Sequence, residues 1–151
     1  MSFVTQADTF GGMDDFRKEL TAVVEELVAA GATPIFLMVD LVGAEYLRQS
    51  AKDPEALSRF RETCMASLSG AAGNASVFSY GEIRIVAILQ GFDRLKTFAL
   101  VEKMRRTLPL LAQSFDVLLQ PEFDTIEFEP ATGVAGVINQ LVSPRARMDA
   151  A

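Results

Sequence analysis

The apolar run from Ile35 to Val42 (IFLMVDLV) constrains the fold of this chain more than any other segment. Turn-forming residues bound it, because Pro34 precedes it and Gly43 follows it. A short, continuous apolar run between such residues is typical of a strand that is buried on both faces. A strand covered on both faces needs helices on either side of its sheet. The run therefore predicts a central sheet flanked by helices.

Helix and strand patterns lie on both sides of this run along the chain. Helices are expected from Asp14 or Asp15 to about Ala30, from Asp53-Pro54 to the glycine region at 70–73, from Gly91-Asp93 until Pro109 ends or kinks the helix, and over 132–142. Strands are expected over 75–79 and 83–89, and as a last pair over 115–120 and 124–128 around Pro121-Glu122. Leu95, Phe98 and Val101 mark successive turns of the third helix, and its apolar residues, including Phe98 and Met104, are expected in the core or an interface.

This order of elements predicts an α+β fold. Without its first helix the chain is βαββαβ, the split βαβ arrangement of ferredoxin-like and palm folds. In this topology the first and third core strands lie side by side at the centre of an antiparallel or mixed sheet. The second core strand lies beside one of them, and the fourth lies at an edge. We expect one domain over residues 1–142 and a flexible tail over 143–151.

Charge, cysteine usage and the lack of histidine exclude several functions. The 151-residue chain has a net charge of −6 and no basic run, which argues against a nucleic acid polymer as partner. No apolar stretch reaches the roughly 20 residues that span a bilayer. No secretory signal is visible and Cys64 has no second cysteine to pair with, so a cytoplasmic protein is expected. Without histidine, Ser-His-Asp triads, Cys-His pairs and histidine-bound zinc are excluded within this chain.

Two carboxylates are the candidate site residues. Asp40 lies inside the apolar run, and an ionised carboxylate is costly to bury unless it is paired, hydrogen-bonded or metal-bound. Glu82 lies at the tip of the expected hairpin, after Gly81. If both project from the same end of adjacent strands, they could hold Mg²⁺ against a triphosphate. The alternative is structural: Asp40 caps a loop or helix, and Gly81-Glu82 form a turn.

The pattern resembles the GGDEF family of bacterial diguanylate cyclases over nearly the whole chain, and more distantly the palm fold of class III nucleotide cyclases. The family's opening motif D-x-L-T-G-L-x-N-R is followed loosely by residues 8–16 (DTFGGMDDF), its D-x-D-x-F-K-x-x-N-D motif corresponds to 40–49 (DLVGAEYLRQ), and its signature hairpin corresponds to 80–84 (YGEIR). The resemblance implies that Asp40 and Glu82 stand at the metal-binding positions. It also implies that Gly81, Lys103 and Arg106 would contact nucleotide; alternatively, the two basic residues belong to a solvated helix end.

Several positions depart from the family pattern. Glu45 stands where the family has a phosphate-binding lysine, and Arg48 stands where it has the asparagine that recognises guanine. Tyr80 replaces the first glycine of the signature, where a side chain would crowd the nucleotide. The product-inhibition motif R-x-x-D is absent, since Ala71 and Asn74 occupy its positions. The resemblance therefore implies a vestigial metal pair and no catalytic residues.

Three functions follow from this resemblance. The first is a catalytically inactive GGDEF-like regulatory or protein-interaction domain in bacterial cyclic di-GMP signalling, with a protein partner or a second copy of itself. The second is a weakly active diguanylate cyclase, a dimer that condenses two GTP molecules with Mg²⁺. The third is a sensor that binds GTP without turnover. No cofactor is expected for the first, and Mg²⁺ is expected if the nucleotide site persists.

Overall fold

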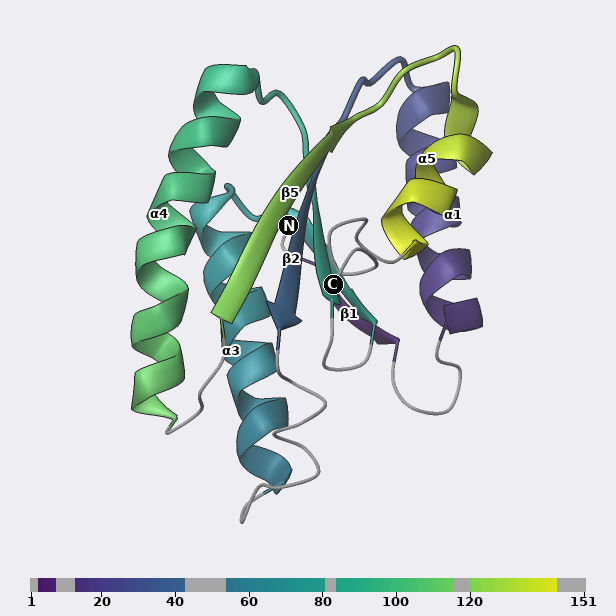
Figure 1. The fold of residues 1–151 in the computed structure, drawn as a ribbon. Helices are drawn as coiled ribbons and strands as arrows, with labels where there is room; N and C mark the ends of the chain where they lie inside the picture. Colours follow the sequence, from purple (N-terminus) through teal and green to yellow (C-terminus); the bar gives the residue numbers. More distant parts are fainter. Residues whose placement is uncertain (1–2, 8–12, 43–53, 81–83, 116–119, 144–151) are drawn as a thin grey trace.

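The computed structural model describes residues 3–7, 13–42, 54–80, 84–115 and 120–143. Within these ranges a five-stranded sheet lies between two pairs of helices (Figure 1). The strands are β1 Phe3–Ala7, β2 Ile35–Val42, β3 Ser76–Tyr80, β4 Arg84–Leu89 and β5 Gln120–Glu127; the helices are α1 Met13–Ala29, α3 Pro54–Ala71, α4 Arg94–Ser114 and α5 Gly133–Val142. Among the described residues, no helix combines the length and apolar character needed to cross a bilayer.

The sheet order is β1-β3-β4-β2-β5, which confirms the predicted α+β fold. The first and third core strands, β2 and β4, pair antiparallel at the centre, from Ile35↔Leu89 to Asp40↔Arg84. The second core strand, β3, pairs antiparallel with β4. The fourth, β5, pairs antiparallel with β2 and forms one edge.

Strand β1 was not predicted. It pairs parallel with β3, from Phe3↔Ser76 to Ala7↔Tyr80, and forms the other edge of the sheet. Its partner lies about 70 residues away in the sequence, and such long-range parallel pairing leaves no local pattern beyond a short stretch of strand-forming residues.

The two faces of the sheet bury separate cores, because successive side chains of a strand point to opposite faces. The core under α3 and α4 contains the odd-numbered β2 residues together with buried residues of both helices: Ile35, Leu37, Val39, Leu41, Phe60, Cys64, Met65, Leu68, Leu100, Met104 and Leu108. The core under α1 and α5 contains even-numbered β2 residues together with buried residues of other elements: Phe16, Leu20, Val24, Phe36, Met38, Phe78, Val86, Ile88, Phe128, Val137, Ile138 and Leu141. The run Ile35–Val42 is thus covered on both faces, as predicted.

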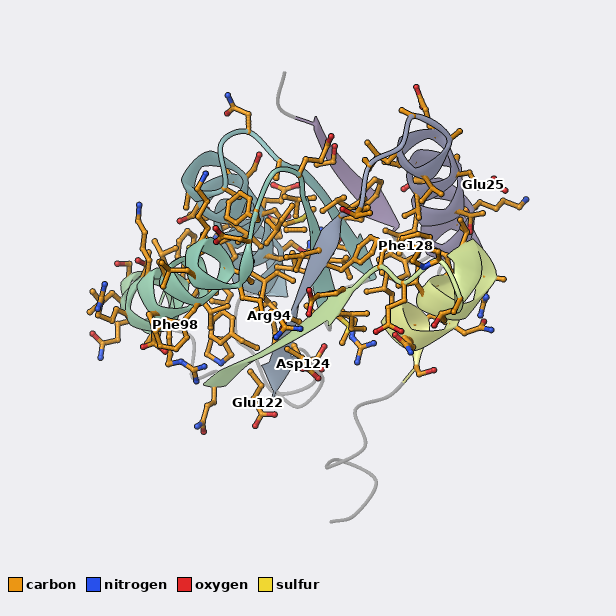
Figure 2. All side chains as sticks on the ribbon, turned by 90° about the horizontal axis from the view of Figure 1, so that it is seen from above. Glu25, Arg94, Phe98, Glu122, Asp124 and Phe128 are labelled. Atoms are coloured by element: carbon orange, nitrogen blue, oxygen red, sulfur yellow. The ribbon has the colours of Figure 1, made fainter. Side chains whose placement is uncertain are left out.

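Helix α4 does not end at Pro109, which was one of the two expectations for this residue. It continues through Pro109 to Ser114, because Leu108 and Ala112 are buried on its inner side while Pro109 is exposed. Tertiary packing therefore outweighs the cost of about 3 kcal/mol for a proline inside a helix. Leu95 and Phe98 are exposed, and Figure 2 shows Phe98 on the outer side of the helix.

Two further boundaries were wrong. Helix α1 begins at Met13, so Asp14 and Asp15 lie in its first turn and do not cap it. The expected strand pair around Pro121-Glu122 is one strand, β5, which pairs with β2 across both residues. An edge strand tolerates proline because half of its backbone N–H groups face away from the sheet. Residues 116–119 lie outside the described ranges.

Candidate functional site

Asp40 lies near the end of β2, on the face of the sheet that α1 and α5 cover. Only 2% of its surface is exposed. Its cross-strand partner on β4 is Arg84, which is 6% exposed. Directly opposed residues of an antiparallel pair point to the same face. The register of β2 and β4 therefore brings a buried carboxylate and a buried guanidinium together.

The Arg84 side chain binds Asp40 through two nitrogens. Its Nε donates to Asp40 Oδ1 at 2.6 Å, and its Nη2 donates to Asp40 Oδ2 at 3.2 Å. Its Nη1 donates to the carbonyl oxygens of Leu141 at 2.7 Å and Ser143 at 2.6 Å. The guanidinium thus joins the sheet to the C-terminal end of α5.

The positive charge of Arg84 and the negative charge of Asp40 compensate each other in a buried site. Two-point pairing of a guanidinium with a carboxylate is among the stronger ion pairs in proteins. The last carbonyl groups of a helix carry partial negative charge, so a cation there is favourable as well. Both Asp40 oxygens already accept hydrogen bonds from Arg84, so a divalent cation bound to this carboxylate would lie close to a fixed positive charge.

A third charged residue continues the same row across the sheet. Glu122 on β5 lies opposite Asp40 on the side of β2 away from Arg84, and it is half-buried. Glu122 was expected between two strands; its pairing with the distant β2 places it inside one strand, opposite Asp40. Among the described residues, no group of three or more carboxylate, cysteine or histidine side chains is arranged to hold a metal ion.

The predicted partner of Asp40, Glu82, lies outside the described residues, as does Gly81. The strands that precede and follow them in the sequence are described. Strands β3 and β4 form an antiparallel hairpin whose last pair is Tyr80↔Arg84. Because Arg84 also pairs with Asp40, the end of β3, the start of β4 and the end of β2 lie at the same end of the sheet. The metal role of Asp40 and Glu82 stays a prediction.

Lys103 and Arg106, the predicted phosphate contacts, are exposed on α4. Helix α4 packs on the sheet face opposite to the one that carries Asp40, since Met104 and Leu108 belong to the core with the odd-numbered β2 residues. The structure therefore does not bring these two basic side chains together with Asp40.

The fold and the end of the sheet at Asp40 define a palm-type α+β domain. No family model matches the sequence, and no curated protein matches it. Among solved structures, the chain is similar to the GGDEF domain of DgcB from Caulobacter crescentus, crystallised in complex with c-di-GMP, with a TM-score of 0.63 and 14% sequence identity. The match covers 83% of this chain and 75% of that domain. The chain thus has the fold of a GGDEF domain.

Proposed function

We propose that this chain is a GGDEF-fold domain of cyclic di-GMP-type signalling that acts as a regulatory or protein-interaction module and does not turn over nucleotide. One observation carries the proposal: the carboxylate at the metal-binding position, Asp40, is held at both oxygens by Arg84. The signalling context comes from the similarity to the DgcB domain, whose crystal contains c-di-GMP.

The charge beside Asp40 disfavours a bound metal ion. A metal-dependent cyclase uses carboxylate oxygens as ligands of Mg²⁺, which binds oxygen in near-ideal octahedral geometry. At Asp40 the Arg84 guanidinium lies beside the carboxylate. Its positive charge would repel Mg²⁺ strongly, because little water screens charges in a buried site. Arg84 is itself tied to the Leu141 and Ser143 carbonyls, so moving it aside would also release the end of α5. The departures at Glu45, Arg48 and Tyr80 weaken nucleotide binding further.

The test combines turnover with binding. The purified chain is incubated with Mg²⁺ and GTP, and products are separated chromatographically; we expect no cyclic dinucleotide. Thermal unfolding is then followed with Mg²⁺-GTP, and with c-di-GMP and ATP as comparisons. A ligand at about 100 times its Kd adds roughly 2.7 kcal/mol of apparent stability, and we expect no such increase with Mg²⁺-GTP.

The other two functions give distinct results in the same experiment. Formation of cyclic di-GMP would identify a cyclase and refute the proposal. A stabilisation by Mg²⁺-GTP without product, lost when Asp40 is changed to Asn, would identify the GTP sensor. The Asp40→Asn variant keeps the size of the side chain, so its own folding is checked by circular dichroism before the comparison.

A further inference from the structure

Strand β5 has one open side, because it forms an edge of the sheet. Among the described strands it pairs with β2 alone. The Phe128 N–H donates to the Pro34 carbonyl oxygen, toward β2, whereas the Thr125 N–H donates to the Asp124 carboxylate at 3.0 Å. Backbone groups of an antiparallel strand point alternately to its two sides. The odd-numbered residues of 123–127 therefore direct their backbone groups to the open side.

This edge can accept a further strand over part of its length. Pro121 is an odd-numbered residue of β5 and has no N–H to offer on the open side, so its end of the strand is blocked. From Phe123 to Glu127 the open backbone groups remain. An extended peptide that adds to such an edge gains main-chain hydrogen bonds, and pockets for its alternate side chains then give specificity.

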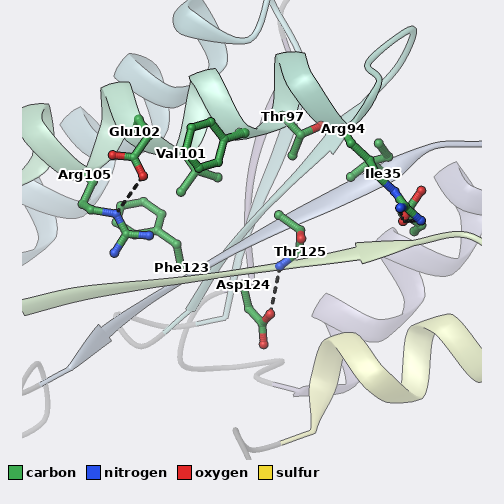
Figure 3. A pocket seen from close by; sticks show the side chains of 11 residues that line it. Ile35, Arg94, Thr97, Val101, Glu102, Arg105, Phe123, Asp124 and Thr125 are labelled. Carbon is green, nitrogen blue, oxygen red and sulfur yellow. Dashed lines mark hydrogen bonds and ion pairs between the residues drawn. The ribbon is translucent and has the colours of Figure 1, made fainter.

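Such a pocket lies beside the open part of β5. A groove of about 410 Å³ runs between α4 and β5, and Figure 3 shows Val101 and Phe123 facing each other across it. Phe98 also lines the groove, although 63% of its surface is exposed. Alternate side chains of an added strand point to this face of the sheet. Apolar side chains at those positions would enter the groove and cover Phe98.

The charges that border the groove compensate each other. Arg94 lies 3.2 Å from Glu127, and Arg105 lies 3.7 Å from Glu102, with its guanidinium carbon 5.3 Å from the centre of the Phe123 ring. Each cation thus has a carboxylate beside it. The groove therefore favours apolar side chains and selects no particular charge.

The other face of β5 is acidic. Its even-numbered residues include Glu122 and Asp124, and β5 contains no lysine or arginine. Figure 3 shows the Asp124 carboxylate directed away from the groove. Glu122 continues the row of Arg84 and Asp40 across the sheet, and the Arg84 charge is already compensated by Asp40. A residue of an added strand opposite Glu122 is next in this row, and opposite charges across paired strands are stabilising. Basic side chains are therefore favoured on this face.

We infer that the open edge of β5 binds an extended segment of a partner protein in which apolar residues alternate with lysine or arginine. The segment adds a sixth strand, its apolar side chains enter the α4–β5 groove, and its basic side chains lie beside Glu122 and Asp124. A second copy of β5 fits poorly, because antiparallel self-pairing would bring these carboxylates of both chains together on one face. This inference rests on the proposed function, since it names the surface through which an inactive domain would act.

The test is a selection of random peptides on the purified chain. A phage library of random decapeptides is panned against the immobilised protein, and we expect enriched peptides in which apolar residues alternate with lysine or arginine. The most enriched peptide is synthesised with a fluorescein label and titrated by fluorescence anisotropy. N-methylation of the alternate backbone nitrogens that face β5 should weaken binding at least tenfold, and N-methylation of the other alternate set should not, because an added strand bonds through one side only.

Variants of the protein locate the binding site. Thr125→Pro removes one N–H on the open side and should weaken binding at least tenfold, while Thr125→Val keeps this N–H and is its matched control. Charge reversal in Glu122→Lys/Asp124→Lys should also cost at least tenfold, and Phe98→Ser should weaken binding severalfold. Lys103→Glu changes an exposed residue of α4 that does not line the groove, and it should leave binding unchanged. Circular dichroism checks the folding of each variant.

Several results would overturn the inference: no enriched peptide, enriched peptides without the alternation, or binding that withstands N-methylation or charge reversal at Glu122 and Asp124. A dimer in sedimentation equilibrium that Thr125→Pro abolishes would overturn it in favour of a second copy. Peptides enriched only on an Arg145→Glu/Arg147→Glu variant would overturn it in favour of the chain's own segment 144–151. Failure of the proposed function looks different, since it would appear as cyclic dinucleotide formed from GTP, whatever the peptide selection gives.

Discussion

Arg84 on β4 and Asp40 on β2 form a buried ion pair with Nε and Oδ1 2.6 Å apart, and the side chains expose only 7% and 3% of their surface. The same guanidinium donates to two carbonyl groups at the end of α5. One side chain therefore connects the two central strands of the sheet with the last helix. Asp40, a residue of the predicted metal site, is thus part of a buried structural ion pair with Arg84.

Removing one member of the pair should be strongly destabilising. Asp40→Ala leaves the Arg84 guanidinium buried without its carboxylate, at an expected cost of about 3–5 kcal/mol of unfolding free energy. Urea unfolding measures this as a lower midpoint at an unchanged slope. Arg94→Ala breaks the exposed pair with Glu127 and should cost no more than about 1 kcal/mol. Equal losses in the two variants would contradict the structural role of Asp40.

The N-cap of α4 should contribute measurably. The Asp93 side chain accepts a hydrogen bond from the Lys96 backbone N–H at 2.7 Å. Asp93→Ala should lower the unfolding free energy by about 1 kcal/mol, because a helix N–H loses its acceptor. Asp93→Asn is the matched control and should stay close to the original protein, since asparagine caps helices equally well. Chemical denaturation of both variants checks the difference.

Truncating two phenylalanines, Phe60 and Phe98, should change the unfolding free energy by very different amounts. Phe60 is fully buried and its ring lies 6.0 Å from that of Phe115, so Phe60→Ala should cost about 3–5 kcal/mol. Phe98→Ala should change the unfolding free energy by no more than about 0.5 kcal/mol, since its ring is mostly exposed. A large loss of unfolding free energy for Phe98→Ala would show that the Phe98 side chain is buried in the folded protein.

Cys64 should be inert while the protein is folded. Burial raises the pKa of its thiol to about 12, because the thiolate is poorly solvated inside the core. The thiolate is the reactive form, and at pH 8 it would be roughly one part in ten thousand. Ellman's reagent should therefore react slowly with the native chain and quickly in concentrated urea. Fast reaction of the native protein at pH 8 would show that the core under α3 opens readily.

Glu19 makes stability depend on pH. Burial, and secondly the nearby Asp15 carboxylate, raise the pKa of Glu19 above its ordinary value of 4.5. The folded state therefore favours protonated Glu19, and its contribution to stability is present below pH 4.5 and lost as the pH rises through the raised value. Glu19→Gln should melt at a higher temperature than the original chain at pH 7. The difference should shrink as the pH falls to 4, and Glu25→Gln, the same exchange at an exposed residue of α1, is the matched control.

The βαββαβ order of the core and the arrangement of its strands could be predicted from the sequence, apart from the edge strand β1. The apolar run Ile35–Val42 required cover on both faces, and the βαββαβ order then placed β2 and β4 at the centre with the fourth core strand at an edge. Local patterns suffice for this, because helix and strand periodicities and turn residues act over a few positions. The sequence also marked Asp40 as a buried carboxylate in need of a partner.

The tertiary structure alone decided what that partner is. Arg84 and Glu122 flank Asp40 through the registers of β4 and β5, and register depends on pairing between segments about 40 to 80 residues apart. Packing likewise determined which side of α4 is buried: Met104 lies in the core, while Phe98, expected in the core or an interface, is exposed. The position of strand β1 was likewise decided by tertiary structure, since all of its pairing is with the distant strand β3. These features come from contacts between distant parts of the chain, which no short stretch of sequence encodes.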